Sequence, residues 1–231
     1  MMRALVASLV LLIAIVIPIY YYDLIFMCVG NLSMGWVFSS IFLRILVIAL
    51  TAIFVKQIFF LFKKSRDWRS IWAFLIALPV GFGISFITPI YNSDYGDLSD
   101  NESLNFESLD AIAPNVVIKS EEHKIIGFFS TDCGHCKVTA FFLGVNKEAG
   151  QKIPVYAFFN DNTENVSEFI QENNGHHFIT HVIPDMNSFL QLSGAIFPSV
   201  FLLNESNNTL KHWSGDVLNF SALDELLAIE S

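Results

Sequence analysis

The stretch Ile125-Ile126-Gly127-Phe128-Phe129-Ser130-Thr131-Asp132-Cys133-Gly134-His135-Cys136-Lys137 decides the fold of the second half of the chain. Its apolar start predicts a buried strand, which leads through a short polar turn into a helix that opens with two cysteines. A cysteine there lies beside unpaired N–H groups and the positive end of the helix dipole, which favour a thiolate. A cysteine pair with this spacing after a strand indicates redox chemistry, because a structural zinc site needs two more ligands at similar spacing.

The segments that follow have a characteristic order. We expect an apolar strand over 153–159, a polar helix over 166–173, a strand that follows Pro198, a turn, a strand ending at Gly215 and a last helix over 221–229. This order resembles the thioredoxin superfamily, and Cys-Gly-His-Cys is the tetrapeptide typical of protein disulfide isomerase. The resemblance implies an α/β thioredoxin-like domain over residues 114–231.

The resemblance implies a role for each residue of the tetrapeptide. Cys133 is the nucleophile that forms a mixed disulfide with a substrate, and Cys136 is the resolving thiol. His135, which with Gly134 separates them, would stabilise the thiolate and so raise the reduction potential. A purely structural disulfide is the alternative, but so short a loop removes little entropy from the unfolded chain. No cofactor is expected.

Pro198 matches the family's cis-proline, which faces the cysteines, although an ordinary trans proline at a strand start is the alternative. Phe197 would pair through its backbone with an extended substrate. Two positions depart from the family. Asp132 stands where an aromatic residue is usual and should oppose thiolate formation at its neighbour. Gly127 replaces a buried carboxylate, so proton transfer to the second cysteine needs another group or water.

Residues 1–91 predict an α-helical membrane anchor of about three helices. The chain has 231 residues, is 53% apolar and carries a net charge of −9, and its apolar excess lies before Tyr91. Transmembrane helices are expected at about 4–21, 37–62 and 71–91. The first also fits a secretory signal peptide, but because no small-residue cleavage site follows it we favour an uncleaved helix.

Basic residues predict the orientation of this anchor. The loop between the second and third spans holds Lys63, Lys64, Arg66 and Arg69, whereas the loop between the first and second has neither Lys nor Arg. The N-terminus is therefore expected in the cytoplasm, and three crossings place the C-terminal domain in the periplasm, outside the inner membrane. A cysteine pair exported there must make disulfides, shuffle them or be re-reduced by a partner.

Three residues in the anchor allow two interpretations each. Arg44 and Lys56 could act as functional charges within the membrane. We favour the alternative that their side chains extend to opposite membrane surfaces. Cys28 relays electrons to the exported domain or, as we favour, is a small buried hydrophobe. Residues 92–113 are acidic and without periodicity, so we predict a flexible linker.

The sequence thus predicts a membrane-anchored extracytoplasmic thiol–disulfide oxidoreductase. Its partners would be protein thiols or disulfides, the lipid bilayer and a membrane electron donor or acceptor. No basic surface indicates nucleic acid. The direction of electron flow stays open. The competing hypotheses are a copper metallochaperone that uses both cysteines and a histidine, and a non-catalytic docking subunit. We interpret the three nearby histidines, His176, His177 and His181, as part of a polar loop or strand edge, and no metal site is predicted.

Overall fold

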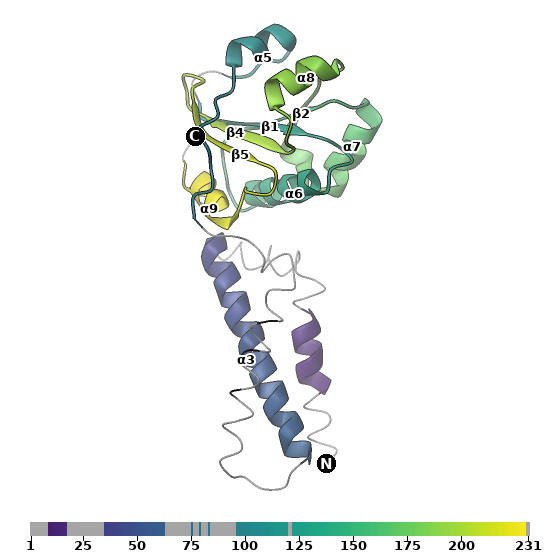
Figure 1. Cartoon of the computed structure of the whole chain (residues 1–231), viewed down its shortest axis with the longest axis vertical. Coiled ribbons are helices and arrows are strands. Elements are labelled where there is room, and N and C mark those ends of the chain that lie inside the picture. Colours follow the sequence, from purple (N-terminus) through teal and green to yellow (C-terminus); the bar gives the residue numbers. More distant parts are fainter. Residues whose placement is uncertain are drawn as a thin grey trace. The chain divides into compact units, whose positions relative to one another are not determined.

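The computed structural model of the chain describes residues 9–17, 35–62, 96–119 and 122–229, together with residues 75, 79 and 83. The chain divides into two compact units, Met1–Ser93 and Asp94–Ser231, and Figure 1 draws both.

The first unit contains the long helix α3, Trp36–Phe62. Its stretch Trp36–Ile58 has a mean hydropathy of 2.4 over 23 residues, and about 20 such residues span the hydrocarbon layer of a bilayer. Among the described residues it is the one helix long and apolar enough to cross a membrane. Residues 9–17, within the first predicted span, are also helical, whereas the third predicted span lies outside the described residues except for three isolated positions.

The second unit is built on one mixed sheet of five strands, in the order β3-β2-β1-β4-β5. The central strand β1 pairs in parallel with β2 and antiparallel with β4; β3 extends the parallel side and β5 the antiparallel side. The strands are β1 (Lys124–Phe129), β2 (Val155–Phe159), β3 (Ile179–Val182), β4 (Ser199–Leu203) and β5 (Thr209–Ser214).

Helices cover both faces of this sheet. In Figure 1, α5 and α8 lie on one face and α6 and α9 on the other; α7 packs on the α6 side, where its Phe169 contacts the rings of Phe129 and Phe159. The helices are α5 (Phe106–Ile112), α6 (Gly134–Glu148), α7 (Thr163–Glu172), α8 (Met186–Ser193) and α9 (Phe220–Ala228), with a short 3-10 helix η2 at Gly175–His177.

The central strands are apolar because both of their faces are covered. Every residue of β1, β2 and β4 is buried. On the α5–α8 face, the ring of Phe128 contacts those of Phe158, Phe189 and Phe201 at centroid distances of 5.4, 5.8 and 6.2 Å. This aromatic core fixes β1, and with it the turn that carries the cysteines.

The α/β class predicted from the sequence is confirmed, and the predicted strands and helices of residues 124–229 occur in the expected order. The second predicted transmembrane segment, 37–62, coincides with α3. The sequence analysis missed α5, β3 and α8. All three are short, with seven, four and eight residues, so their periodicity is weak.

The predicted flexible linker is wrong for residues 96–113, which are part of the second unit. Residues 96–104, called the strap below, run along β5 and α9, and the Asp100 N–H donates to the His212 carbonyl at 2.9 Å. The Leu104 N–H donates to Thr209 Oγ1 at 3.0 Å, and its side chain is buried in the core. Backbone groups that a flexible linker would leave to water are thus bonded to the sheet.

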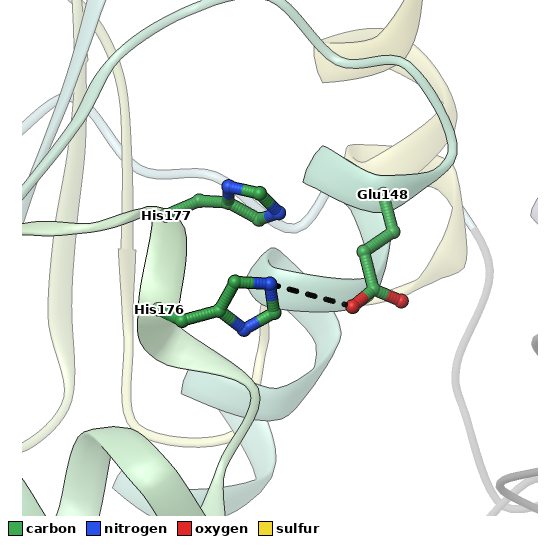
Figure 2. Close-up of side chains that lie close together, drawn as sticks. All are labelled: Glu148, His176 and His177. Carbon is green, nitrogen blue, oxygen red and sulfur yellow. Dashed lines mark ion pairs between the residues drawn. The ribbon is translucent and has the colours of Figure 1, made fainter.

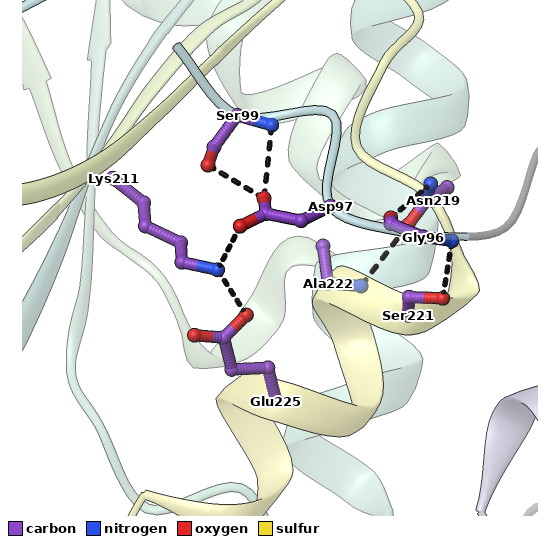
Figure 3. A network of polar contacts seen from close by, with 8 residues as sticks. All are labelled: Gly96, Asp97, Ser99, Lys211, Asn219, Ser221, Ala222 and Glu225. Carbon is purple, nitrogen blue, oxygen red and sulfur yellow. Dashed lines mark hydrogen bonds and ion pairs between the residues drawn. The ribbon is translucent and has the colours of Figure 1, made fainter. Parts of the chain in front are cut away.

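Side chains add to the attachment of the strap, as Figure 3 shows. Lys211 Nζ donates to Asp97 at 2.9 Å and to Glu225 of α9 at 2.6 Å. Hydrogen bonds from Ser99 and from Lys211 lower the pKa of Asp97 to about 2. Gly96 is held at both backbone groups: its N–H donates to Ser221 Oγ and its carbonyl accepts from Asn219 Nδ2.

Helix α5 explains why this acidic segment is folded and not a flexible linker. Asn105 caps the helix, since its Oδ1 accepts from the Ser108 N–H at 3.0 Å. Leu109 is 1% exposed within the core, and Phe106 and Ile112, three residues to either side, pack against the same cluster. Residues three apart share a helix face, so this short segment has an apolar stripe that its six acidic neighbours obscure in a composition analysis.

Candidate active site at the start of helix α6

Cys133 lies at the N-cap of α6, directly beyond the end of the central strand β1. Its backbone is extended, with φ −88° and ψ 119°. Its Sγ accepts a hydrogen bond from the Cys136 N–H at 3.2 Å, so the sulfur takes the position of a capping oxygen. This is the helix end at which N–H groups and the dipole stabilise negative charge, as the sequence predicted.

Cys136 has a different environment, one turn into the helix. It is completely buried, and its Sγ accepts from the Ser130 N–H at 3.4 Å. Burial raises the pKa of the Cys136 thiol, and its contact with Cys133 acts in the same direction. Two cysteines that adjoin in space therefore differ in reactivity, because Cys133 is partly exposed and Cys136 is held protonated.

The loop before β4 completes the site. The Phe197–Pro198 peptide bond is cis, which confirms the prediction for Pro198. The Cys133 thiol lies 3.7 Å from the Phe197 carbonyl oxygen and donates to it. The Phe197 ring is stacked on Phe189 of α8 at 5.5 Å. Residues 64 positions apart in the sequence thus lie together at the Cys133 sulfur.

Gly134, His135 and Asp132 are all exposed at the mouth of the site. Among the described residues, no hydrogen bond or ion pair joins His135 or Asp132 to Cys133, so their influence on the thiolate stays a prediction. Asp132 also lines a groove of about 260 Å³ between the turn and α7, together with Thr131, Lys137, Asn165, Glu168, Phe169 and Glu172. This groove offers mostly charged and polar groups beside the reactive sulfur.

Gly127 shows why the family's buried carboxylate is missing. A Cβ placed on Gly127 would lie 2.4 Å from Cε2 and 2.7 Å from Cζ of Phe129, far closer than such atoms approach. The phenyl ring of Phe129 therefore takes the space that a side chain at position 127 would need. Position 127 therefore contributes no carboxyl group to the strand that leads to the cysteines.

A buried hydrogen-bond relay lies behind the cis-proline loop, and the sequence analysis did not find it. His212 is 1% exposed; its Nε2 lies 2.9 Å from Ser199 Oγ and its Nδ1 lies 2.7 Å from Asp100 Oδ1. Desolvation acts against the Asp100 carboxylate, but hydrogen bonds from the Glu102 N–H and from His212 outweigh it and lower the pKa of Asp100. The relay connects the strap to the residue that follows Pro198.

The three histidines considered in the sequence do not form one cluster. His176 and His177 lie together on η2, close to Glu148 at the end of α6. His181 is on β3, where its ring packs on Phe158 at 5.4 Å and burial lowers its pKa. Among the described residues, neither of the two groups of close metal-ligating side chains includes a cysteine.

Strand order, the cysteine pair at the start of the helix after the central strand, and the cis-proline before β4 define a thioredoxin-like fold. No protein-family model and no curated protein sequence matches the chain.

Solved structures of this fold resemble the second unit. A thioredoxin domain of a thiol–disulfide oxidoreductase from Bacteroides vulgatus is 16% identical, with a TM-score of 0.40 over 47% of this chain and 81% of that one. StoA from Bacillus subtilis is 19% identical, with a TM-score of 0.40 over 47% and 84%. A secreted disulfide oxidoreductase from Mycobacterium tuberculosis is 11% identical, with a TM-score of 0.41 over 47% and 82%. Sequence identities this low indicate a similarity of fold alone.

Proposed function

We propose that this protein is a membrane-anchored thiol–disulfide oxidoreductase that acts outside the cytoplasm on the thiols and disulfides of other proteins. The observation that carries the proposal is the asymmetry of the cysteine pair. Cys133 caps α6 and is partly exposed, and its Sγ accepts a hydrogen bond from the Cys136 N–H at 3.2 Å. The Cys136 side chain is completely buried. One thiol is accessible to a substrate, and the other reacts only inside the site.

In the reducing direction, the Cys133 thiolate attacks one sulfur of a substrate disulfide. A Cys133–substrate disulfide forms, and the second substrate sulfur leaves as a thiolate. Cys136 then passes its proton to water and attacks Cys133 Sγ, which forms the Cys133–Cys136 disulfide and releases the first substrate sulfur as a thiolate. The substrate gains two electrons and the protein loses two. The oxidising direction is the same sequence in reverse.

The environment of each sulfur fits these steps. The Cys136 N–H stabilises the attacking sulfur at the helix start. Burial keeps Cys136 protonated, so it does not compete for the substrate before the mixed disulfide has formed. The carbonyl of Phe197, 3.7 Å from Cys133 Sγ, lies where the backbone of an extended substrate would pair with the loop. Phe197 and Pro198 are therefore proposed as substrate-binding residues, and Asp132, Gly134 and His135 as tuning residues.

The anchor and the orientation belong to the same proposal. Helix α3 supports one crossing, and we propose further crossings near 4–21 and 71–91 from the apolar runs there. The cluster of basic residues between the second and third runs supports a cytoplasmic loop, and hence an extracytoplasmic second unit. A periplasmic site would need an electron donor or acceptor in the membrane or beyond it.

The test is an equilibrium titration of the full-length protein in detergent against glutathione, with a Cys28→Ser background to isolate the pair. A reversible two-electron transition is expected, and Cys133→Ser or Cys136→Ser abolishes it. With Cys136→Ser, the mixed disulfide should accumulate, since the resolving step is missing. A pair that forms no reversible disulfide would overturn the proposal.

The potential obtained also decides the direction of electron flow. A value near or above about −180 mV, that of protein disulfide isomerase, fits an oxidase or isomerase. A value near or below about −270 mV, that of thioredoxin, fits a reductase that needs electrons from across the membrane. Stoichiometric binding of Cu(I) that is lost with either cysteine, without disulfide exchange, would instead favour the metallochaperone.

A further inference from the structure

We propose that Glu148, His176 and His177 form a binding site for a divalent cation of the zinc class. Their ligand atoms all lie within 4.8 Å of one another, and His176 Nε2 is 3.8 Å from Glu148 Oε1. The two imidazole centroids are 4.0 Å apart. Figure 2 shows both rings on the side of η2 that faces the carboxylate.

The backbone holds these side chains together. Asn174, just before η2, has a left-handed conformation with φ 59°, which turns the chain sharply onto α6. There, a Cβ on Gly144 would lie 2.2 Å from the Asn174 carbonyl oxygen, so the turn rests directly on the helix backbone. Gly144 and Glu148 are four residues apart and share a helix face. The face that presents Glu148 is thus the face against which the histidines are fixed.

The ligand set suits zinc. Two imidazole nitrogens and one carboxylate oxygen are ligands that Zn²⁺ takes in tetrahedral sites, with the fourth position open to water. Bonds of about 2.0 to 2.2 Å place the ligand atoms of such a site about 3.3 Å apart. The atoms here need to approach by at most about 1.5 Å, which small rotations of exposed side chains provide. Hard cations such as Mg²⁺ or Ca²⁺ prefer oxygen ligands instead.

The local charges favour a cation as well. Glu148 is the last residue of α6, where the helix dipole is negative. The neighbouring Lys147 is turned away, since its Nζ donates to the Ile153 carbonyl at 2.9 Å. The histidines themselves are exposed, so a metal can reach them without opening the fold.

This site is separate from the cysteines. Helix α6 has 15 residues, which corresponds to about 22 Å, and the cysteines are at its first turn. A bound ion would join the end of α6 to η2 and stabilise the folded chain by mass action. The inference does not depend on the proposed redox function.

The experiment uses full-length, tag-free protein in detergent in which all three cysteines are replaced by serine, so that no thiol binds metal. Zn²⁺ is titrated by calorimetry, and the unfolding temperature is measured with and without Zn²⁺. One ion per chain and a raised unfolding temperature are expected, with no effect of Mg²⁺.

Variants of the ligands decide the assignment. His176→Gln, His177→Gln and Glu148→Gln should each weaken Zn²⁺ binding by more than the roughly 10- to 100-fold that outer-shell changes cost. His123→Gln and Glu164→Gln, which lie outside the cluster, serve as matched controls and should bind as the parent does. No Zn²⁺ binding by the parent, or binding unchanged in the three ligand variants, would overturn the proposal.

Discussion

At the scale of single residues, the site depends on what surrounds each sulfur rather than on the cysteines alone. Both residues carry a thiol, but the thiol of Cys133 is partly exposed and that of Cys136 is completely buried. Phe129 fills the space that a side chain at position 127 would need. Burial makes the deprotonation of Cys136 costly.

The raised pKa of Cys136 predicts a pH dependence of stability for the reduced protein. The unfolded thiol titrates near the ordinary value of 9.0, whereas the buried thiol keeps its proton to higher pH. The stabilisation is thus fully present below pH 9 and is lost as the pH rises. We expect the free energy of unfolding, relative to Cys136→Ala, to fall by up to about 1.4 kcal/mol per pH unit above pH 9.

Urea denaturation of both proteins under reducing conditions, between pH 7.5 and 10.5 in steps of about half a unit, measures this difference. The contributions of titratable groups that both proteins share cancel in the difference between their free energies of unfolding. A difference that stays constant over this range would show that Cys136 titrates alike in the folded and unfolded chains.

Packing between Gly127 and Phe129 predicts a second outcome. Gly127→Ala should destabilise the protein by about 1 to 3 kcal/mol, because the added methyl group overlaps the Phe129 ring. The double variant with Phe129→Leu should be less destabilised than the sum of the single changes, with a coupling of about 0.5 to 3 kcal/mol. Denaturant unfolding of the four proteins measures this cycle.

Gly134→Ala is the matched control, since a Cβ there has nothing within 4 Å. Additive single changes at positions 127 and 129 would contradict the overlap.

At the scale of elements, the strap and α5 change the boundaries of the domain. The N-terminal part of the second unit is bonded to β5 and α9 and covers the sheet face that also carries α8. Through Asp100 and His212 it contacts Ser199 at the start of β4. A segment with the composition of a linker is therefore part of the structure that positions the cis-proline loop.

Leu109→Ala tests this assignment. Leu109 is 1% exposed, so its truncation should destabilise the second unit by about 2 to 5 kcal/mol. In a flexible linker the same change would have no effect. Labelling of the buried Cys136 thiol during urea denaturation, in a Cys28→Ser background, reports on this unit.

Val117→Ala is the control, because Val117 is 85% exposed and should change the stability by less than about 0.5 kcal/mol. Equal stabilities of the Leu109 variant and the parent would restore the linker interpretation.

At the scale of the whole molecule, the two units differ in the chemistry that their surroundings allow. Asp23 and Asp67 are the acidic residues of Met1–Ser93, and all other Asp and Glu residues lie in the second unit. An apolar unit with basic residues suits a bilayer and its cytoplasmic surface, and a strongly acidic globular unit suits water. Under the proposed function, coupling the two units in one chain would keep a thiol–disulfide site at a membrane surface.

The orientation predicts which side of the membrane Cys133 occupies. In intact cells expressing the Cys28→Ser protein, a membrane-impermeant maleimide should label Cys133 after mild reduction, because the proposed orientation puts the second unit outside. Cys133→Ser should remove this labelling, since Cys136 is buried. Labelling that requires lysis of the cells would place the second unit in the cytoplasm and contradict the proposed orientation.

Much of this structure follows from local signals in the sequence. The apolar runs that form β1, β2 and β4, the caps and turns beside them, the cysteine pair and the length of α3 are properties of neighbouring residues. The prediction for Pro198 came from the order of segments and is confirmed as a cis bond. For such features a single stretch contains enough periodicity and turn chemistry to determine the element.

Tertiary structure alone decided the rest. The strap could not be predicted, because its partners His212 and Lys211 are more than 100 residues away and its own residues are mostly polar. The relay from Asp100 to Ser199 and the separation of His181 from His176 and His177 likewise arise only when the sheet forms. The sequence determined the long apolar helix, the central strands and the helix that carries the cysteines, since each depends on its own residues. The short elements α5, β3 and α8 and the contacts between distant residues were decided by the tertiary structure.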